Sequence, residues 1–105
     1  MVKTLNPNFK KDIEIKLEKQ FFMKLMNFSL TKIEEGEIEG ELDIEQIHKQ
    51  QKGFVHGGVI ATMADVVAGF AAVSLVESGN HVVTAEIKVS YLNPGIGNKL
   101  VAKGW

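Results

Sequence analysis

His56-Gly57-Gly58 and Asp65 have the residue types needed to act on a carbonyl group. Glycines at a helix start let the backbone approach a ligand closely, because no Cβ intervenes. The amides of a first helical turn have no partner within the helix, and the helix dipole adds partial positive charge. Together they favour an oxyanion, such as a polarised carbonyl oxygen. The same glycines could equally relieve crowding between a helix and a sheet, so the motif alone leaves both roles open.

Asp65 favours the catalytic role. It is the one acid in the apolar stretch FVHGGVIATMADVVAGFAAVSLV (54–76), and its neighbours on the helix surface are small or apolar: Ala61, Met63, Ala68 and Gly69. Burying an unpaired carboxylate costs free energy, and a partly desolvated carboxylate is a good general base. The alternative is an acid whose oxygens are satisfied by hydroxyls or backbone donors at a subunit interface.

The spacing of these groups predicts a dimer. Gly57 and Asp65 are separated by about 12 Å along one helix, at about 1.5 Å per residue, whereas a base and an oxyanion donor must both reach one reacting carbon. Two antiparallel helices would bring Gly57 of one chain beside Asp65 of the other. Small residues along the helix would let the two helices approach closely: Ala61, Ala64, Ala68 and Gly69. We therefore expect a two-fold dimer with two composite sites.

The remaining chain predicts an α+β domain that supports this helix. Residues 8–25 have the apolar spacing of an amphipathic helix, with Asn8 as N-cap. Residues 26–44 alternate as a β-hairpin around Glu35-Gly36, with one acidic face. A polar connection over 48–55 leads to the apolar helix, expected from about Gly57 to Glu77 and closed by Gly79-Asn80.

Two more strands are predicted after the helix. HVVTAEIKVSYLNP (81–94) is rich in β-branched residues, and KLVAKGW (99–105) begins another strand. An antiparallel partner for that last run would come next, so we expect the sheet to lack its last strands or to be covered at its edge by another chain. We interpret residues 1–105 as a single domain.

Composition excludes several classes of function. The net charge of −1 argues against a nucleic-acid-binding protein. The absence of cysteine excludes disulfides and thiolate chemistry and is compatible with the cytoplasm. No secretory signal is evident, and the acid within 59–76 argues against a membrane span. The histidines lack the spacing of a metal site, and no G-x-S-x-G motif is present.

HKQQKGFVHGGVIATMADVVAGFAA followed by VVTAEIKVSYLNPG closely resembles the hotdog-fold acyl-CoA thioesterases of the phenylacetate-pathway (PaaI-like) type, over residues 22–105. The resemblance implies a long central helix wrapped by an antiparallel sheet, and assembly into homodimers or homotetramers. It also implies hydrolysis of an acyl-CoA to coenzyme A and a free acid, with no metal or other cofactor.

The same resemblance assigns roles to individual residues. The Gly57 amide would polarise the carbonyl, Asp65 would activate water, and Thr84 would position that water from a strand on the partner side. His56 would fix the loop through a hydrogen bond or protonate the leaving thiolate. Gln50 stands where many relatives have asparagine, and its amide would help to hold the carbonyl with altered reach. The family's loop glycine falls on Gly53, and Gly58 is a further substrate-binding position. The apolar residues expected to line the acyl group are Phe54, Val59 and Met63, with Phe70 as an additional candidate.

Two other functions fit the same scaffold. One is an acyl-thioester-binding module without turnover. The other is a hydroxyacyl-thioester dehydratase, which would need a paired acid and base, whereas His-Gly-Gly with a water-orienting Thr84 fits hydrolysis better. The sequence names neither the acyl group nor the lysines that would meet the coenzyme A phosphates; Lys52, Lys88 and Lys99 are candidates.

Overall fold

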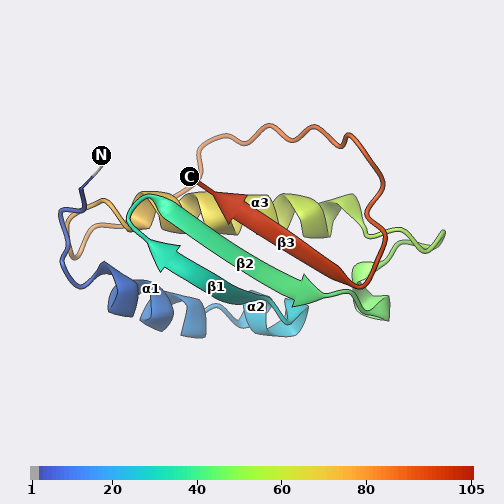
Figure 1. Cartoon of the computed structure of the whole chain (residues 1–105), viewed down its shortest axis with the longest axis horizontal. Helices are drawn as coiled ribbons and strands as arrows, with labels where there is room; N and C mark the ends of the chain where they lie inside the picture. Colours follow the sequence, from blue (N-terminus) through green and yellow to red (C-terminus); the bar gives the residue numbers. More distant parts are fainter. Residues whose placement is uncertain (1–2) are drawn as a thin grey trace.

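The computed structural model describes residues 3–105 and confirms the α+β prediction (Figure 1). Two short helices come first and are followed by a hairpin, a 3-10 turn, one long helix and a last strand. In chain order these are α1 (Phe9–Glu18), α2 (Phe21–Met26), β1 (Ser29–Glu34), β2 (Glu37–Asp43), η1 (Gln46–His48), α3 (Gly57–Val73) and β3 (Lys99–Gly104).

The three strands form an antiparallel sheet in the order β1-β2-β3. The predicted hairpin is confirmed: Glu34 pairs with Glu37 and Ile33 with Ile38, and Gly36 makes the turn at φ +69°, a conformation that glycine adopts without steric cost. β3 then pairs along β2, with Leu100 opposite Leu42.

The two faces of this sheet differ in polarity, as the alternation in β2 requires. Ile38, Gly40 and Leu42 are buried towards α3. The acids of the opposite face meet lysines: Lys32 contacts Glu37 at 2.9 Å, and Lys99 contacts Glu41 at 3.1 Å. The hydrogen bond to Glu41, with the charges of Glu41 and Asp43, raises the pKa of Lys99.

α3 lies along the buried face of the sheet (Figure 1). One stripe of the helix is buried at helical spacing: Val59, Met63, Val67, Phe70 and Ala71. The contact with β3 is tight, because a Cβ added at Gly104 would stand 2.7 Å from the Val67 carbonyl group. This close approach fixes the depth at which α3 sits on the sheet.

Ser74 ends α3 and joins it to the hairpin. Its buried hydroxyl donates to the Ala71 carbonyl at 2.6 Å and accepts from the Gly36 amide at 2.7 Å. The helix therefore stops at Val73, and the predicted end at Glu77 with a Gly79-Asn80 cap is wrong. Within residues 3–105, no helix combines the length and the apolarity that crossing a bilayer requires.

The prediction of one helix over residues 8–25 is wrong in its middle. Gln20 takes an extended conformation (φ −92°, ψ 91°) and separates α1 from α2. The break turns the second helix so that Met23 and Met26 are buried, whereas Phe21 and Leu25 of the predicted stripe are 75 % and 70 % exposed. The tertiary contacts of the methionines thus override the simple i, i+4 pattern.

Asn8 occupies the predicted N-cap position of α1, but its side chain makes no capping bond. The side chain of Asn6 stabilises this end of α1 instead. Its Oδ1 accepts from the Asn8 amide at 3.0 Å, and its Nδ2 donates to Asp12 at 2.6 Å.

Residues 81–94 do not form the predicted strand. They run as an extended segment beside α3 (Figure 1), and among the described residues their backbone pairs with no strand. We call residues 81–94 the extended segment. Its β-branched composition therefore specifies extended backbone, but sheet pairing also needs an adjacent strand edge.

Candidate active site

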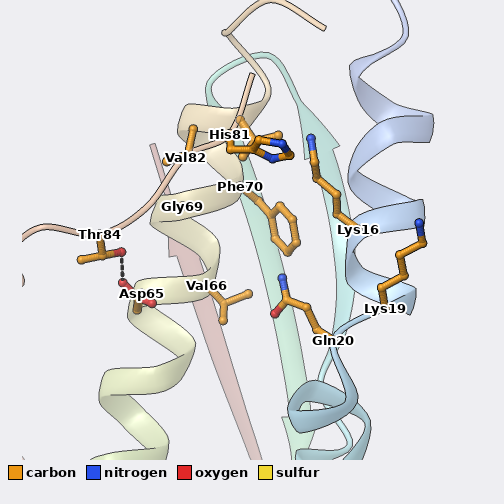
Figure 2. Close-up of a pocket in the computed structure, with 11 residues that line it drawn as sticks. Lys16, Lys19, Gln20, Asp65, Val66, Gly69, Phe70, His81, Val82 and Thr84 are labelled. Atoms are coloured by element: carbon orange, nitrogen blue, oxygen red, sulfur yellow. Dashed lines mark hydrogen bonds between the residues drawn. The ribbon is translucent and has the colours of Figure 1, made fainter. Parts of the chain in front are cut away.

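Asp65 and Thr84 are joined directly. The Thr84 hydroxyl donates to Asp65 Oδ1 at 2.6 Å, from the extended segment to the middle of α3 (Figure 2). Asp65 is half-buried. A hydroxyl bonded to one carboxylate oxygen fixes the plane of the carboxylate and leaves the other oxygen to accept a proton. The bond forms within one chain, and Thr84 lies on the extended segment and not on a strand.

His56 holds the start of α3. It is the N-cap residue, and its Nδ1 accepts from the Gly58 amide at 2.9 Å. Because Nδ1 is the acceptor, the proton of the neutral ring is assigned to Nε2. This hydrogen bond agrees with the loop-fixing role considered for His56.

Tyr91 is a site residue that the sequence did not indicate. Its hydroxyl donates to the Gly57 carbonyl at 3.1 Å, and its ring lies 3.3 Å from the position of a Cβ at Gly57. The Gly57–Gly58 peptide is therefore held at both ends, by Tyr91 at its oxygen and by His56 at its nitrogen. No pattern of spacing reveals this contact, because 34 residues separate the partners.

The Gly57 amide is the donor that remains. Among residues 3–105, no carbonyl or side chain accepts from it, in contrast to the Gly58 and Val59 amides, which bond to His56. An unpaired amide at the positive end of a helix suits an oxyanion. The geometry is thus compatible with the role expected for Gly57.

Gln50 shapes the loop before α3. Its Oε1 accepts from the Lys52 amide at 2.6 Å, and its backbone bonds to Phe54 and Gly53. Gly53 completes the turn at φ +87°. With its oxygen engaged, Gln50 keeps the amide nitrogen as a donor.

A cavity of about 480 Å³ opens beside Asp65 between α1, α3 and the extended segment (Figure 2). Its α3 wall is mostly apolar, and its other walls carry cationic and amide groups. The lining residues are Lys16, Lys19, Gln20, Asp65, Val66, Gly69, Phe70, Val73, His81, Val82 and Thr84. We call this cavity the Asp65 pocket.

The helix start opens into a different cavity. His56, Gly58 and Val59 line a space of about 330 Å³ that Asp65 does not reach. Gly57 lines neither cavity, so within one chain the candidate oxyanion donor lies apart from the candidate base, as the spacing along the helix requires.

Several predicted contacts with the acyl group fall outside the Asp65 pocket. Met63 is 3 % exposed and packs in the core, and Val59 is also buried. Phe54 is 38 % exposed and lines neither cavity. Phe70 does line the pocket, so α3 contributes apolar surface, but through a different set of side chains from that expected.

His48 has a structural role, and the candidate phosphate-binding lysines are either paired or exposed. His48 is fully buried, with Nε2 bonded to the Met26 carbonyl at 2.8 Å and Nδ1 accepting from the Glu45 amide at 2.9 Å. Lys99 is already paired with Glu41. Lys52 and Lys88 are exposed. Within residues 3–105, no cluster of three or more metal-ligating side chains exists.

Comparison with known proteins gives a consistent result. The family model described as the thioesterase superfamily matches residues 52–105. A candidate esterase of Saccharolobus solfataricus is 26 % identical over 93 residues, which are 89 % of this chain and 61 % of that protein. The chain thus spans less than two thirds of that relative.

Solved structures share the fold. A thioesterase family protein from Silicibacter pomeroyi is 28 % identical with a TM-score of 0.89, over 90 % of this chain and 70 % of its own. The Escherichia coli PaaI protein from the phenylacetic acid degradation operon is 19 % identical with a TM-score of 0.82 (95 % and 71 %). A Bacillus halodurans protein solved with CoA is 26 % identical with a TM-score of 0.72 (90 % and 64 %). The predicted hotdog fold is confirmed.

Proposed function

Because this chain belongs to the thioesterase superfamily, we propose that it hydrolyses an acyl-CoA thioester to a free acid and coenzyme A. The observation that carries the proposal is the Thr84–Asp65 hydrogen bond at the Asp65 pocket. It gives a half-buried carboxylate a fixed direction. The similar Bacillus halodurans structure with CoA supports a coenzyme A thioester as substrate.

In the proposed reaction, Asp65 takes a proton from a water molecule that attacks the thioester carbonyl carbon. The negative charge that develops on the carbonyl oxygen is stabilised by the Gly57 amide at the helix start. The carbon–sulfur bond then breaks, and the leaving thiolate takes up the proton that Asp65 accepted, which returns Asp65 to its carboxylate form. These steps need no metal or organic cofactor, since coenzyme A is part of the substrate.

The two groups would meet across a dimer. The side of α3 away from the core carries small residues, including Ala61, Ala64 and the exposed Ala68, and a Cβ at Gly69 would meet open space. A second α3 can therefore approach closely in antiparallel orientation. Gly57 of one protomer would then face Asp65 of its partner, which closes the separation of the two cavities.

Replacing Asp65 with Asn tests the base. The amide is nearly the same size but cannot accept the proton, so thiol release from acyl-CoA should fall by about 10²- to 10⁴-fold. Thiol release can be followed with a chromogenic disulfide over a panel of acyl-CoAs, with circular dichroism as the check of folding. Unchanged turnover in Asp65→Asn would remove Asp65 from the mechanism.

A complementation experiment tests the shared site. Gly57→Pro removes the amide donor at the first helical position, where proline is tolerated; His56 already has the extended backbone (φ −62°, ψ 135°) that suits a residue before proline. Gly57→Pro and Asp65→Asn should each be inactive. Mixed and reassembled, they form one intact site per heterodimer, and about a quarter of wild-type activity should return. No recovery, with heterodimers demonstrated, would contradict a site built from two chains.

The binding-module and dehydratase alternatives have less support. His56 Nδ1 accepts a hydrogen bond from the Gly58 amide, so this nitrogen is not available as the base of a dehydratase-type acid–base pair. A binding module would hold acyl-CoA without releasing thiol, and the same panel of substrates distinguishes it.

A further inference from the structure

The end of the Asp65 pocket away from Asp65 is electropositive. Lys16 of α1 and His81 of the extended segment meet there, above Phe70 (Figure 2). Gln20 lies on the other side of the Phe70 ring from Lys16 and His81, near Val66, and the ammonium group of Lys19 turns outward. The pocket therefore combines an apolar wall with nitrogen donors at one end.

Lys16 stands at an unusual position for a lysine. It is half-buried and lies next to Leu17, one turn after the fully buried Ile13, on the side of α1 that faces the core. Lysine at such a position normally extends its charge to water or to a carboxylate. An anionic group in the cavity would give this ammonium group a counter-charge.

The nearby acids do not neutralise Lys16. Among residues 3–105, the ion pairs involve Lys10, Lys32, Lys99 and Lys103. Asp12, one turn earlier on α1, accepts from the Asn6 side chain at 2.6 Å, and Asp65 accepts from Thr84. The position of Lys16 in the last turn of α1 also suits the helix dipole, but that interaction does not require a cavity.

We propose that the Lys16 end of the Asp65 pocket binds an anionic group of the thioester substrate. The inference rests on the proposed function, because it takes the Asp65 end as the place of the thioester. A carboxylate or phosphate oxygen would accept from the Lys16 ammonium, with the His81 ring as a further donor. The apolar part of the ligand would lie against Val66, Phe70 and Val73.

Repulsion sets the orientation of such a ligand. Asp65 is negative when it acts as a base, so an anionic group is disfavoured near it and favoured near Lys16. Asp65 and Phe70 are about 7.5 Å apart along α3, at about 1.5 Å per residue. The anionic group would thus be separated from the thioester by a short spacer. This spacing fits a carboxylate at the far end of the acyl chain; a phosphate of coenzyme A would reach the Lys16 end only if the longer pantetheine arm folded back.

Equilibrium binding of four non-hydrolysable thioether analogues tests the proposal. Their chains have equal length and end in a methyl group or a carboxylate, and each is made on coenzyme A and on pantetheine, which lacks the phosphates. Calorimetry compares the wild-type protein with Lys16→Gln and with Lys11→Gln, which makes the same charge change at an exposed position of α1. The analogue that carries the recognised anion should bind the wild type and Lys11→Gln about tenfold more tightly than its uncharged counterpart.

The two sources of the anion give different results. If Lys16→Gln abolishes the preference for carboxylate over methyl on both carriers, the anion is on the acyl chain. If it abolishes the preference for coenzyme A over pantetheine with both chains, the anion is a phosphate. Either result supports the proposal, including where Lys16→Gln lowers the melting temperature, because a purely structural lysine would not change these ratios.

Equal affinity ratios in Lys16→Gln and Lys11→Gln, or no binding of any analogue to the wild type, would overturn the proposal. The measurement is independent of turnover. If the wild type shows the Lys16-dependent preference but releases no thiol from any acyl-CoA, the anion site stands and the proposed hydrolysis fails.

Discussion

The sheet and the extended segment hold their residues in place by different means. Along β2, every residue from Ile38 to Asp43 has a partner on β3, and the backbone ladder fixes the strand. The extended segment, residues 81–94, is richer in β-branched residues than β2 but has no ladder among the described residues. Two side-chain bonds connect it to α3, from Thr84 to Asp65 and from Tyr91 to Gly57.

The sheet and the extended segment therefore have different roles, the first in stability and the second in function. The ladder and the α3–β3 packing hold the fold together, and changes there should act on the free energy of unfolding. The two bonds of the extended segment end on the candidate base, Asp65, and on the carbonyl of Gly57, the residue whose amide is the candidate oxyanion donor. Changes to them should act on catalysis, with small effects on stability.

Thr84→Val gives the largest effect expected in the extended segment. Valine keeps the β-branched shape but cannot donate to Asp65, and loss of a hydrogen bond to a charged group is worth about 1.5–3 kcal/mol. The catalytic efficiency kcat/KM should therefore fall by roughly 10- to 100-fold, measured as thiol release. Thr84→Ser retains the hydroxyl and should keep most activity. Equal losses in both variants would contradict the role of the hydrogen bond.

Gly104→Ala tests the opposite region. The added methyl group would press on the Val67 backbone of α3 at 2.7 Å, and overpacking of this kind costs about 1–3 kcal/mol. Urea unfolding should show the lower stability, while kcat per folded molecule changes little. Lys103→Ala, on the exposed side of the same strand, is the control and should stay within about 0.5 kcal/mol of wild type. A stable Gly104→Ala would show that α3 can shift on the sheet.

Tyr91→Phe has the smallest expected effect. It removes the hydroxyl that bonds to the Gly57 carbonyl but keeps the ring against Gly57, so a neutral hydrogen bond of about 0.5–1.5 kcal/mol is lost. We expect kcat to fall by roughly tenfold or less, with the melting temperature nearly unchanged. Ser90→Ala, at the preceding exposed position, should leave both unaltered. A fall in stability without a fall in kcat would assign Tyr91 a packing role.

Much of the fold could be predicted because its signals are local. The alternation around Glu35-Gly36 identified the hairpin, and the apolar stretch after His56 identified the long helix from its first residue. The end of that helix could not be predicted, because Ser74 is fixed by its bond to Gly36, 38 residues away. The break at Gln20 depends in the same way on which methionines reach the core.

For the candidate site, the sequence supplied residue types but not all of their contacts. Asp65, Thr84 and Gly57 were singled out from their chemistry and from the family resemblance. Tyr91, Lys16 and His81 were not, because each reaches the site from another element and carries no motif of its own.

The sequence by itself determined the α+β class, the helix start with its glycines and the single acid within the apolar helix, because these depend on hydrophobic period and on local backbone chemistry. Only the tertiary structure decided that 81–94 would lie beside α3 without pairing, that Thr84 would reach Asp65, and that Lys16 would enter the same pocket. Those outcomes depend on contacts between residues far apart in the chain, and the shape of the packed core, not local preference, selects which of them form.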